Sequence, residues 1–248
     1  MPLSAVIITH NAAASLEPCL ASVAFADEVL VVDSDSSDDT VKLAERHRAR
    51  VVRKKWLGFG PQKQFAIEAA THDWVLCIDA DERVSELLQT SILAAIAAPE
   101  SGAYTMARCN RFLGRWLKHG EGYPDRSLRL FDRRLARWSD DNVHEKVLTS
   151  QPVIRLRGDL LHDSAESLER YLEKQNRYTS LQATQLALSG GKVSAWQLVL
   201  SPLLRFIKFY FFRLGFLDGV PGLIHVSIGC MNSFNKYAKL MALQRSAP

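Results

Sequence analysis

Two aspartates that follow an apolar run are the residues best placed to do chemistry in this sequence. Residues 74–78 read as a short buried strand, and Asp79 and Asp81 come directly after it. If the chain stays extended, both carboxylates leave one face of the strand roughly 7 Å apart, so one cation fits between them. Oxygen ligands at a strand end suit Mg²⁺ or Mn²⁺ beside a phosphate. The alternative is a polar strand exit that caps a helix beginning near Ser85.

Two further apolar runs also end in polar residues. Residues 3–9 predict a buried strand, after which Asn11 is expected to cap a helix over 12–23. Residues 29–32 predict a second strand. Its last residue, Asp33, is expected to point into the crevice where a ligand would lie.

The elements between these strands alternate in type. Strands and helices joined by short connections predict parallel strands covered by helices, that is, an α/β fold. The expected elements are a helix over 41–47, a strand over 50–53, a Gly/Pro loop over 56–61, a helix over 62–71 and an amphipathic helix over 85–98.

Composition and charge narrow the class of protein. The chain has 248 residues, 47% of them hydrophobic and 23% charged, which is ordinary for a globular protein. Its four cysteines form no CxxC pair, and a strand begins within a few residues of the N-terminus, so we expect a reduced, cytoplasmic setting. From Trp196 onward, six Lys/Arg face one acid, Asp218, which predicts an anionic surface as partner for that segment and gives no indication of nucleic acid.

Six motifs in a fixed order resemble a known family. They are ITHN, VVDSDSSDDT, KQFAIEAATHDWVLCIDADERV, YPDRSLRLFDRR, DNVHEKV and FLDGVPGL. Together they resemble family 2 glycosyltransferases of the GT-A fold, and more narrowly the bacterial glucosyltransferases of lipopolysaccharide inner-core assembly. The sequence departs from the family pattern at Ser34, where a second Asp is usual, and at Ala12, where an acid is common.

The resemblance implies a Rossmann-like mixed sheet flanked by helices, with a helical C-terminal appendage. Residues 1–165 would form the catalytic domain, with 1–100 binding the nucleotide-sugar and 101–165 the acceptor, and 166–248 would form the helical region. A UDP-sugar donor and a divalent metal, Mg²⁺ or Mn²⁺, are implied as well. The implied nucleotide-sugar ligands are Thr9, Asn11, Asp33, Lys63, Asp79, Ala80 and Asp81, and the implied metal ligands are Asp79, Asp81 and His162.

The second half is expected to hold the catalytic base and the acceptor. An inverting transfer needs one group to take the proton of the attacking hydroxyl. Glu145 is our first candidate, with Asp125 and Asp141 in reserve, although Glu145 is equally suited to a structural salt bridge. Basic residues would bind phosphates on the acceptor, unless they belong to a solvated loop. They are Arg111, Arg115, Lys118, His119, Arg126 and Arg129.

The last third reads as helices. A polar helix is expected over 168–188, and residues 203–217 place apolar side chains on one arc opposite Arg205, Lys208 and Arg213. Such a basic, aromatic helix suits an anionic membrane surface, while packing against the catalytic domain or a second subunit is the alternative. The segment 223–243 would pair with it as a hairpin.

These features together predict an enzyme on the cytoplasmic face of an inner membrane. The resemblance implies that it transfers a hexose, most simply glucose, from UDP to a heptose of a lipopolysaccharide core, with inversion. Transfer to a polyprenyl phosphate or another envelope glycan is the alternative within enzymes. A phosphatase fits poorly, because its DxD usually follows the first strand. A non-catalytic scaffold that binds anionic lipid is the third class.

Overall fold

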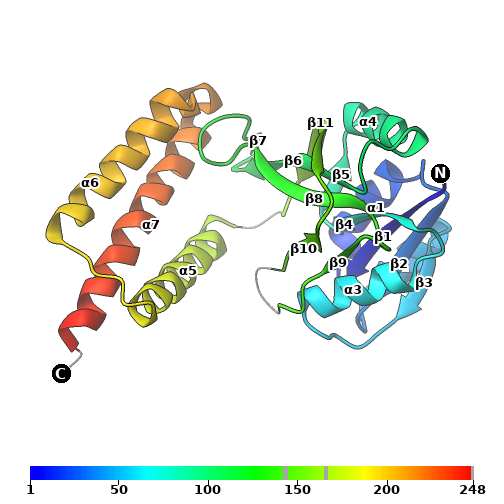
Figure 1. The fold of residues 1–248 in the computed structure, drawn as a ribbon, viewed down its shortest axis with the longest axis horizontal. Helices are drawn as coiled ribbons and strands as arrows, with labels where there is room; N and C mark the ends of the chain where they lie inside the picture. The colour runs from blue at the N-terminus through cyan, green and yellow to red at the C-terminus, as the bar shows by residue number, and fades with distance from the viewer. Residues whose placement is uncertain (142–144, 165–166, 247–248) are drawn as a thin grey trace. The chain divides into compact units, whose positions relative to one another are not determined.

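The computed structural model describes residues 1–141, 145–164 and 167–246. The chain forms two compact units (Figure 1), and each is described by itself. The first unit comprises Met1–Arg108 and Asp125–Asp163, and the second comprises Cys109–Pro124 and Ser164–Pro248. Residues 109–124 belong to the same unit as the C-terminal helices.

The first half of the sheet is parallel, as the alternation of strands and helices predicts. Its strands run in the order β3-β2-β1-β4, so that the earliest strand lies centrally. Register brings their carboxyl ends together, with Thr9 opposite Asp33 and Ile8 opposite Asp79. The elements are β1 (Leu3–Thr9), α1 (Ala13–Ser22), β2 (Glu28–Asp33), α2 (Thr40–Arg46), β3 (Arg50–Arg53), α3 (Phe59–Ala69) and β4 (Trp74–Asp79).

The other half of the sheet is antiparallel, so the sheet is mixed. It continues the order as β4-β8-β6-β11-β5, and β9 and β10 form a separate two-stranded sheet. The elements are β5 (Glu82–Val84), α4 (Glu86–Ala97), β6 (Ala103–Phe112), β7 (Arg115–Trp116), β8 (Asp125–Asp132), β9 (Ala136–Trp138), β10 (Val147–Thr149) and β11 (Val153–His162).

Alternate residues of β4 supply two separate cores. Leu76 and Ile78 pack on one face with α1 and α4, while Val75 and Cys77 pack on the other with α3 and Phe131. A central strand buried on both faces needs a continuous apolar run, which is why residues 74–78 carry no polar side chain. The core therefore fixes the point at which β4 leaves the sheet, and with it the position of Asp79.

Three local predictions were wrong. Asn11 does not cap α1: the N-cap is Ala12 without a side-chain bond, and the Asn11 side chain accepts the Ser37 backbone N–H instead. The loop expected over 56–61 is shorter, because α3 begins at Phe59. The chain does not stay extended through Asp81, because it turns after Asp79 and enters β5 at Glu82.

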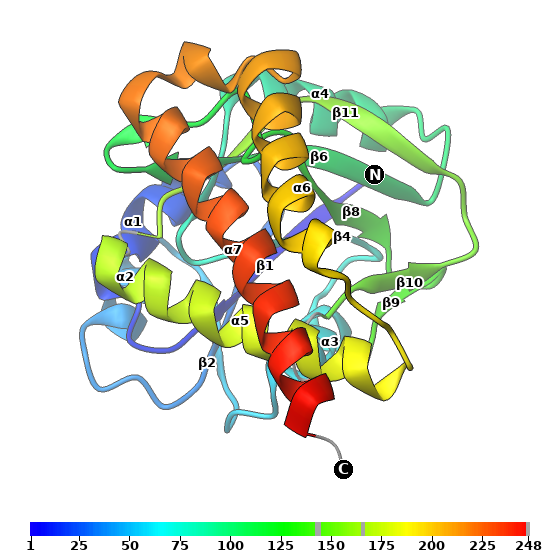
Figure 2. The ribbon, with the colours of Figure 1, turned by 90° about the vertical axis from the view of Figure 1, so that its left-hand side faces the viewer.

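The second unit consists of the C-terminal helices and the segment Cys109–Pro124, which packs against them. α6 and α7 run side by side as a hairpin, and α5 packs across α7 (Figure 2). The single helix expected over 203–217 is wrong, because the chain leaves helical geometry after Phe212 and Leu214 has a φ of 56°. Asp218, which is buried, accepts the backbone N–H groups of Lys118 and His119, and Arg205 pairs with Glu121. The elements are α5 (Leu168–Leu188), α6 (Ala195–Phe206), a π-helical turn η1 (Ile207–Phe212), a 3-10 turn η2 (Gly215–Asp218) and α7 (Gly219–Ser246).

Glu28 links β2 to its neighbours and gives the first unit a predictable response to acid. Its side chain, only 11% exposed, accepts hydrogen bonds from Ser4, Thr71 and Arg50. Burial raises the pKa of Glu28, but these hydrogen bonds outweigh it and lower the pKa to about 2. A lowered folded pKa stabilises the fold above the unfolded pKa of about 4.5, and this contribution is lost as the pH falls toward 2.

We expect Glu28→Gln to lower the free energy of unfolding at pH 7 by roughly 2 kcal/mol, and to flatten its decline below pH ~4.5. Urea unfolding followed by circular dichroism from pH 7 to pH 3 measures both. Glu17→Gln, on an acid whose side chain is 67% exposed, is the matched control. Equal acid slopes in the two variants would contradict the argument.

Candidate active site

The carboxyl ends of β1 and β2 meet in a polar edge. The Thr9 hydroxyl donates to Oδ1 of Asp33 over 2.9 Å, and both residues are buried. The backbone N–H of Ser36 donates to Oδ2 of Asp33 over 3.0 Å, which fixes the turn that follows β2. Asn11, with φ of 49°, accepts the Ser37 N–H over 2.9 Å and so joins the two loops. The predicted nucleotide ligands Thr9, Asn11 and Asp33 therefore lie together.

The buried amide of Gln62, on α3, extends this edge and was not predicted from the sequence. Gln62 Nε2 donates to the Ser34 hydroxyl over 3.0 Å, while its Oε1 is buried and has no hydrogen-bond partner in the described part of the chain. A buried acceptor without a donor is costly unless something else supplies one. The only signal in the sequence is its place beside Lys63 at a helix start, which is too common to be decisive.

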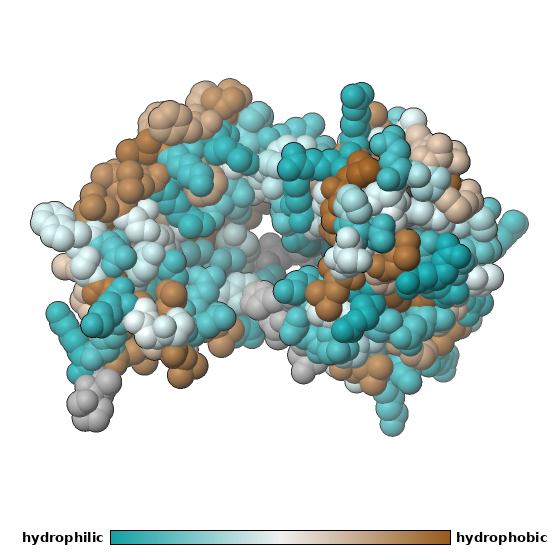
Figure 3. Space-filling model, viewed as in Figure 1, coloured by the Kyte–Doolittle hydropathy of each residue, from teal (hydrophilic) through white to brown (hydrophobic). Residues whose placement is uncertain are grey.

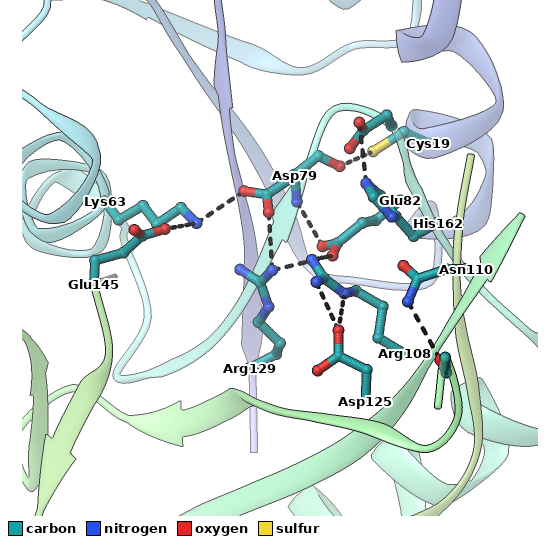
Figure 4. Close-up of polar contacts among 12 residues, drawn as sticks. Cys19, Lys63, Asp79, Glu82, Arg108, Asn110, Asp125, Arg129, Glu145 and His162 are labelled. Atoms are coloured by element: carbon teal, nitrogen blue, oxygen red, sulfur yellow. Dashed lines mark hydrogen bonds and ion pairs between the residues drawn. The ribbon is translucent and has the colours of Figure 1, made fainter. Parts of the chain in front are cut away.

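Asp79 is held between two cations (Figure 4). Lys63 Nζ lies 3.0 Å from its Oδ1, and Arg129 Nη2 lies 2.8 Å from its Oδ2. Arg129 also reaches Glu82 at 3.0 Å, and Glu82 accepts the backbone N–H of Asp79 over 2.9 Å. Both Arg129 and Glu82 are buried. This network explains why the carboxylate of Asp79 is fixed where β4 ends.

The same network sets opposite protonation tendencies on its two acids. Burial raises the pKa of Asp79, but Arg129 and Lys63 outweigh it and hold that pKa far below its usual range. Burial raises the pKa of Glu82, and the neighbouring Asp79 charge raises it further, against the opposing effect of Arg129. The pair therefore holds one firmly ionised carboxylate at Asp79 beside a carboxyl that gains a proton more readily at Glu82.

Asp81 and His162 make a separate pair. Nε2 of His162, at the end of β11, lies 3.3 Å from Oδ2 of Asp81, and both side chains are partly exposed. One carboxylate and one imidazole are suitable ligands for Mn²⁺ or Mg²⁺, so these two residues fit an ion that takes its other ligands from phosphate and water. Within the ranges 1–141, 145–164 and 167–246, no group of three or more His, Cys, Asp or Glu forms a metal cluster. The two carboxylate oxygens of Asp79 contact cations instead: Oδ1 contacts Lys63, and Oδ2 contacts Arg129.

Beside Asp79 lies a basic pocket of about 320 Å³. Glu145 is on its wall, and its Oε1 lies 2.9 Å from Lys63 Nζ, so Lys63 bridges Glu145 and Asp79. Arg126 and Lys146 are exposed residues on the same wall and make no ion pair within the described chain. The other lining residues include Arg108, Arg129 and Trp138.

The other two candidate bases are placed differently. Asp125 is bound by Arg108, whose Nη2 lies 2.6 Å from Oδ2 of Asp125 and whose Nη1 lies 3.5 Å from Glu82. Asp141 is exposed. Residues 142–144 of the same motif lie outside the described residues. Arg108 was missed by the sequence analysis, since a lone Arg inside an apolar strand is not by itself a functional signal.

The predicted acceptor residues divide between the two units. Arg126 and Arg129 line the pocket of the first unit. In the second unit, Arg115 donates to the Leu217 carbonyl over 2.9 Å, and Arg111 lies over the ring of Trp116. Lys118 and His119 belong to the loop that Asp218 holds. These are structural contacts within the second unit.

A parallel half-sheet with acids at its carboxyl edge, continued by an antiparallel half with a basic pocket, defines the GT-A class of glycosyltransferase fold. Residues 4–155 match the family model described as glycosyl transferase family 2, so the chain belongs to that family and is a glycosyltransferase. The fold and the family expected from the six motifs are thereby confirmed.

Relatives extend over nearly the whole chain. An uncharacterized glycosyltransferase of Rickettsia felis is 33% identical, over 96% of this chain and 89% of its own length. The lipopolysaccharide core biosynthesis glycosyltransferase LpsC of Rhizobium meliloti is 31% identical, over 97% of this chain and 92% of its own.

Solved structures share the fold at lower identity. S. aureus TarS 1-349, in complex with UDP-GlcNAc, is 15% identical with a TM-score of 0.53, over 99% of this chain and 92% of that one. Mannosyl-3-phosphoglycerate synthase from Rubrobacter xylanophilus is 17% identical with a TM-score of 0.51, over 79% of this chain and 77% of that one.

Proposed function

We propose that this glycosyltransferase moves a hexose, glucose in the simplest case, from a UDP-sugar to a heptose of a lipopolysaccharide core, with inversion and with a divalent metal. The observation that carries the proposal is the bridge from Asp79 through Lys63 to Glu145. It joins the carboxyl edge of the parallel strands to a basic pocket. The name of LpsC supports the acceptor class, and the UDP-GlcNAc complex of TarS supports a UDP-sugar donor.

The donor would bind at the edge formed by β1, β2 and β4. Asp33 and Thr9 would face the uracil base of UDP, and Asn11 would lie at the rim of the nucleotide pocket. Lys63 would approach the diphosphate, and Asp79 and Ala80, which border the turn after β4, would approach the ribose and sugar. Asp81 and His162 would hold the ion. A divalent ion held by these two residues would supply positive charge to stabilise the departing nucleoside diphosphate.

The acceptor would enter the basic pocket. Arg126 offers an exposed guanidinium group to an anionic substituent, and Arg pairs with phosphate bidentately. Arg129 would contribute only Nη1, because its Nη2 is held by Asp79 and Glu82. Glu145, on the same wall, takes the proton of the attacking hydroxyl as oxygen approaches the anomeric carbon from the face opposite UDP. Attack from that face inverts the anomeric configuration. The enzyme would work peripherally at the cytoplasmic face of the inner membrane, where a lipid-linked core is built.

We expect Asp81→Ala to raise the Kd for UDP in Mn²⁺ by at least about tenfold, to the value measured without metal. The loss follows because the carboxylate of the Asp81–His162 pair is removed. Calorimetric titration with UDP, with and without Mn²⁺ or Mg²⁺, gives the result, and Glu17→Ala is the control on an exposed acid. Metal-enhanced UDP binding that survives in Asp81→Ala would overturn the metal site.

Turnover separates the rival acceptors. Purified enzyme would be supplied with UDP-glucose and either a heptose-terminated core acceptor or a polyprenyl phosphate, and the products identified by mass spectrometry. Glycosylated core supports the proposal, whereas glycosylated polyprenyl phosphate alone would overturn the acceptor assignment.

A further inference from the structure

The outer face of α6 is apolar and faces solvent. Trp196, Val199, Leu200, Leu203 and Leu204 recur at helical spacing, and their exposed fractions lie between 47% and 75%. No residue of α6 is buried. A helix of a globular protein normally turns such a stripe into the core. The apolar stripe of α6 is therefore exposed to solvent, although its composition is typical of a buried helix face.

The apolar surface continues around the bend into α7. Phe211 and Phe212 are exposed, Phe212 to 80%, and they belong to the π-helical turn η1. A groove of about 430 Å³ runs between α6 and α7 and is lined mainly by apolar side chains such as Phe206 and Phe234. Figure 3 shows hydrophobic atoms gathered along α6 and the bend. The exposed large apolar residues beyond Phe212 are Leu214, Phe216, Leu217, Val220, Leu223, Met231, Phe234 and Leu243.

The charge around this surface is positive. The second unit contains 13 Lys/Arg against 5 Asp/Glu, a net +8, while the first unit carries −4. Lys208 is exposed within the π-helical turn, and Arg213 follows that turn. Two acids of this unit are directed away from solvent: Glu121 pairs with Arg205, and Asp218 is buried and accepts the backbone N–H groups of Lys118 and His119. The surface therefore offers two cations, Lys208 and Arg213, that make no ion pair with any described residue and lie beside exposed aromatic rings.

We infer that the α6–α7 bend binds an anionic membrane surface, with its phenylalanines among the acyl chains and Lys208 and Arg213 at the lipid phosphates. Apolar burial and attraction to anionic lipid act together in such surfaces. A second copy of the chain fits less well, because a two-fold interface repeats the same patch on both partners and would bring these cations toward each other. Among the described residues, no single helix has the length and apolar composition to cross a bilayer, but Ala195–Phe212 and Gly215–Arg245 pass that test together, bent by 72°.

Vesicle flotation of the purified full chain tests the inference without any sugar substrate. Phosphatidylcholine vesicles are compared with vesicles that also contain phosphatidylglycerol. We expect strong binding only to the second kind. Phe211→Ser with Phe212→Ser should weaken it roughly 10- to 100-fold, because two exposed rings lose their burial in lipid. Lys208→Gln should weaken it about fivefold, an effect that 0.5 M salt removes.

Leu87→Ser on α4 is the matched control, since Leu87 is an exposed leucine of the first unit, 59% accessible. It should bind vesicles like the unaltered chain. Circular dichroism and the Kd for UDP confirm that each variant is folded. Equal vesicle binding by all variants would overturn the inference. A second outcome would also overturn it. In that outcome the unaltered chain does not bind vesicles but sediments as a dimer, and the variant with both Phe211→Ser and Phe212→Ser sediments as a monomer.

Discussion

Glu145→Gln should lower kcat for sugar transfer by roughly 10²- to 10⁴-fold and leave the Kd for UDP nearly unchanged. The substitution keeps the size of the side chain and removes its capacity to take a proton. The carboxylate lies on the wall of the basic pocket and 2.9 Å from Lys63, so its loss alters the chemical step while the polar edge of Thr9 and Asp33 stays intact. Single-turnover kinetics with UDP-glucose and a heptose-terminated acceptor measure the effect.

Asp125→Asn and Asp141→Asn are the informative comparisons. Asp125 is held by Arg108, and Asp141 is exposed, so we expect each to cost much less in kcat than Glu145→Gln. If Asp125→Asn or Asp141→Asn abolishes transfer while Glu145→Gln retains most of it, the base is assigned to the wrong carboxylate. If Glu145→Gln instead unfolds more easily and turns over normally, the salt bridge to Lys63 is its whole role.

The parallel half of the fold was predictable because its strands are short apolar runs buried on both faces. Such runs have few alternatives, and the buried strand expected over 3–9 matches β1 to the residue. Polar residues gathered at strand ends follow from the same rule, which is why Asp33 and Asp79 were expected at this edge from their positions, whereas Thr9 was implied by the family resemblance.

The partners of these residues were not predictable, because they come from segments far along the chain. Arg129 reaches Asp79 across a 50-residue separation, and Lys63 reaches Glu145 across 82. Spacing in sequence carries no information about such pairs. The turn after Asp79 was missed for a related reason, because it depends on a distant strand. Glu82 accepts the backbone N–H of Asp79 and begins β5, which pairs with β11. The burial of Glu82 could not be predicted, because in sequence it is one of three closely spaced acids.

Arg129→Met should lower the free energy of unfolding by roughly 3–5 kcal/mol, because removing one partner of a buried ionic network leaves its counterions uncompensated. Arg129 is 5% exposed and touches both Asp79 and Glu82, so its loss leaves Asp79 with Lys63 alone and Glu82 with the more distant Arg108. Urea unfolding followed by circular dichroism gives the value. Arg137→Met is the control, since Arg137 is 56% exposed and pairs with Asp140, which is 82% exposed, and ion pairs in solvent contribute little.

The dependence on pH distinguishes lost charge pairing from lost packing. Arg129 helps to hold the pKa of Asp79 far below its usual range, so in the unaltered chain this group stabilises the fold above its unfolded pKa and loses that contribution on acidification. Without Arg129 the contribution is smaller, and the gap between variant and parent should narrow as the pH falls below about 4. Glu82→Gln added to Arg129→Met should recover part of the loss, because it removes the second buried charge. A gap that stays constant with pH, together with strictly additive losses in the double variant, would mean that Arg129 acts through packing alone.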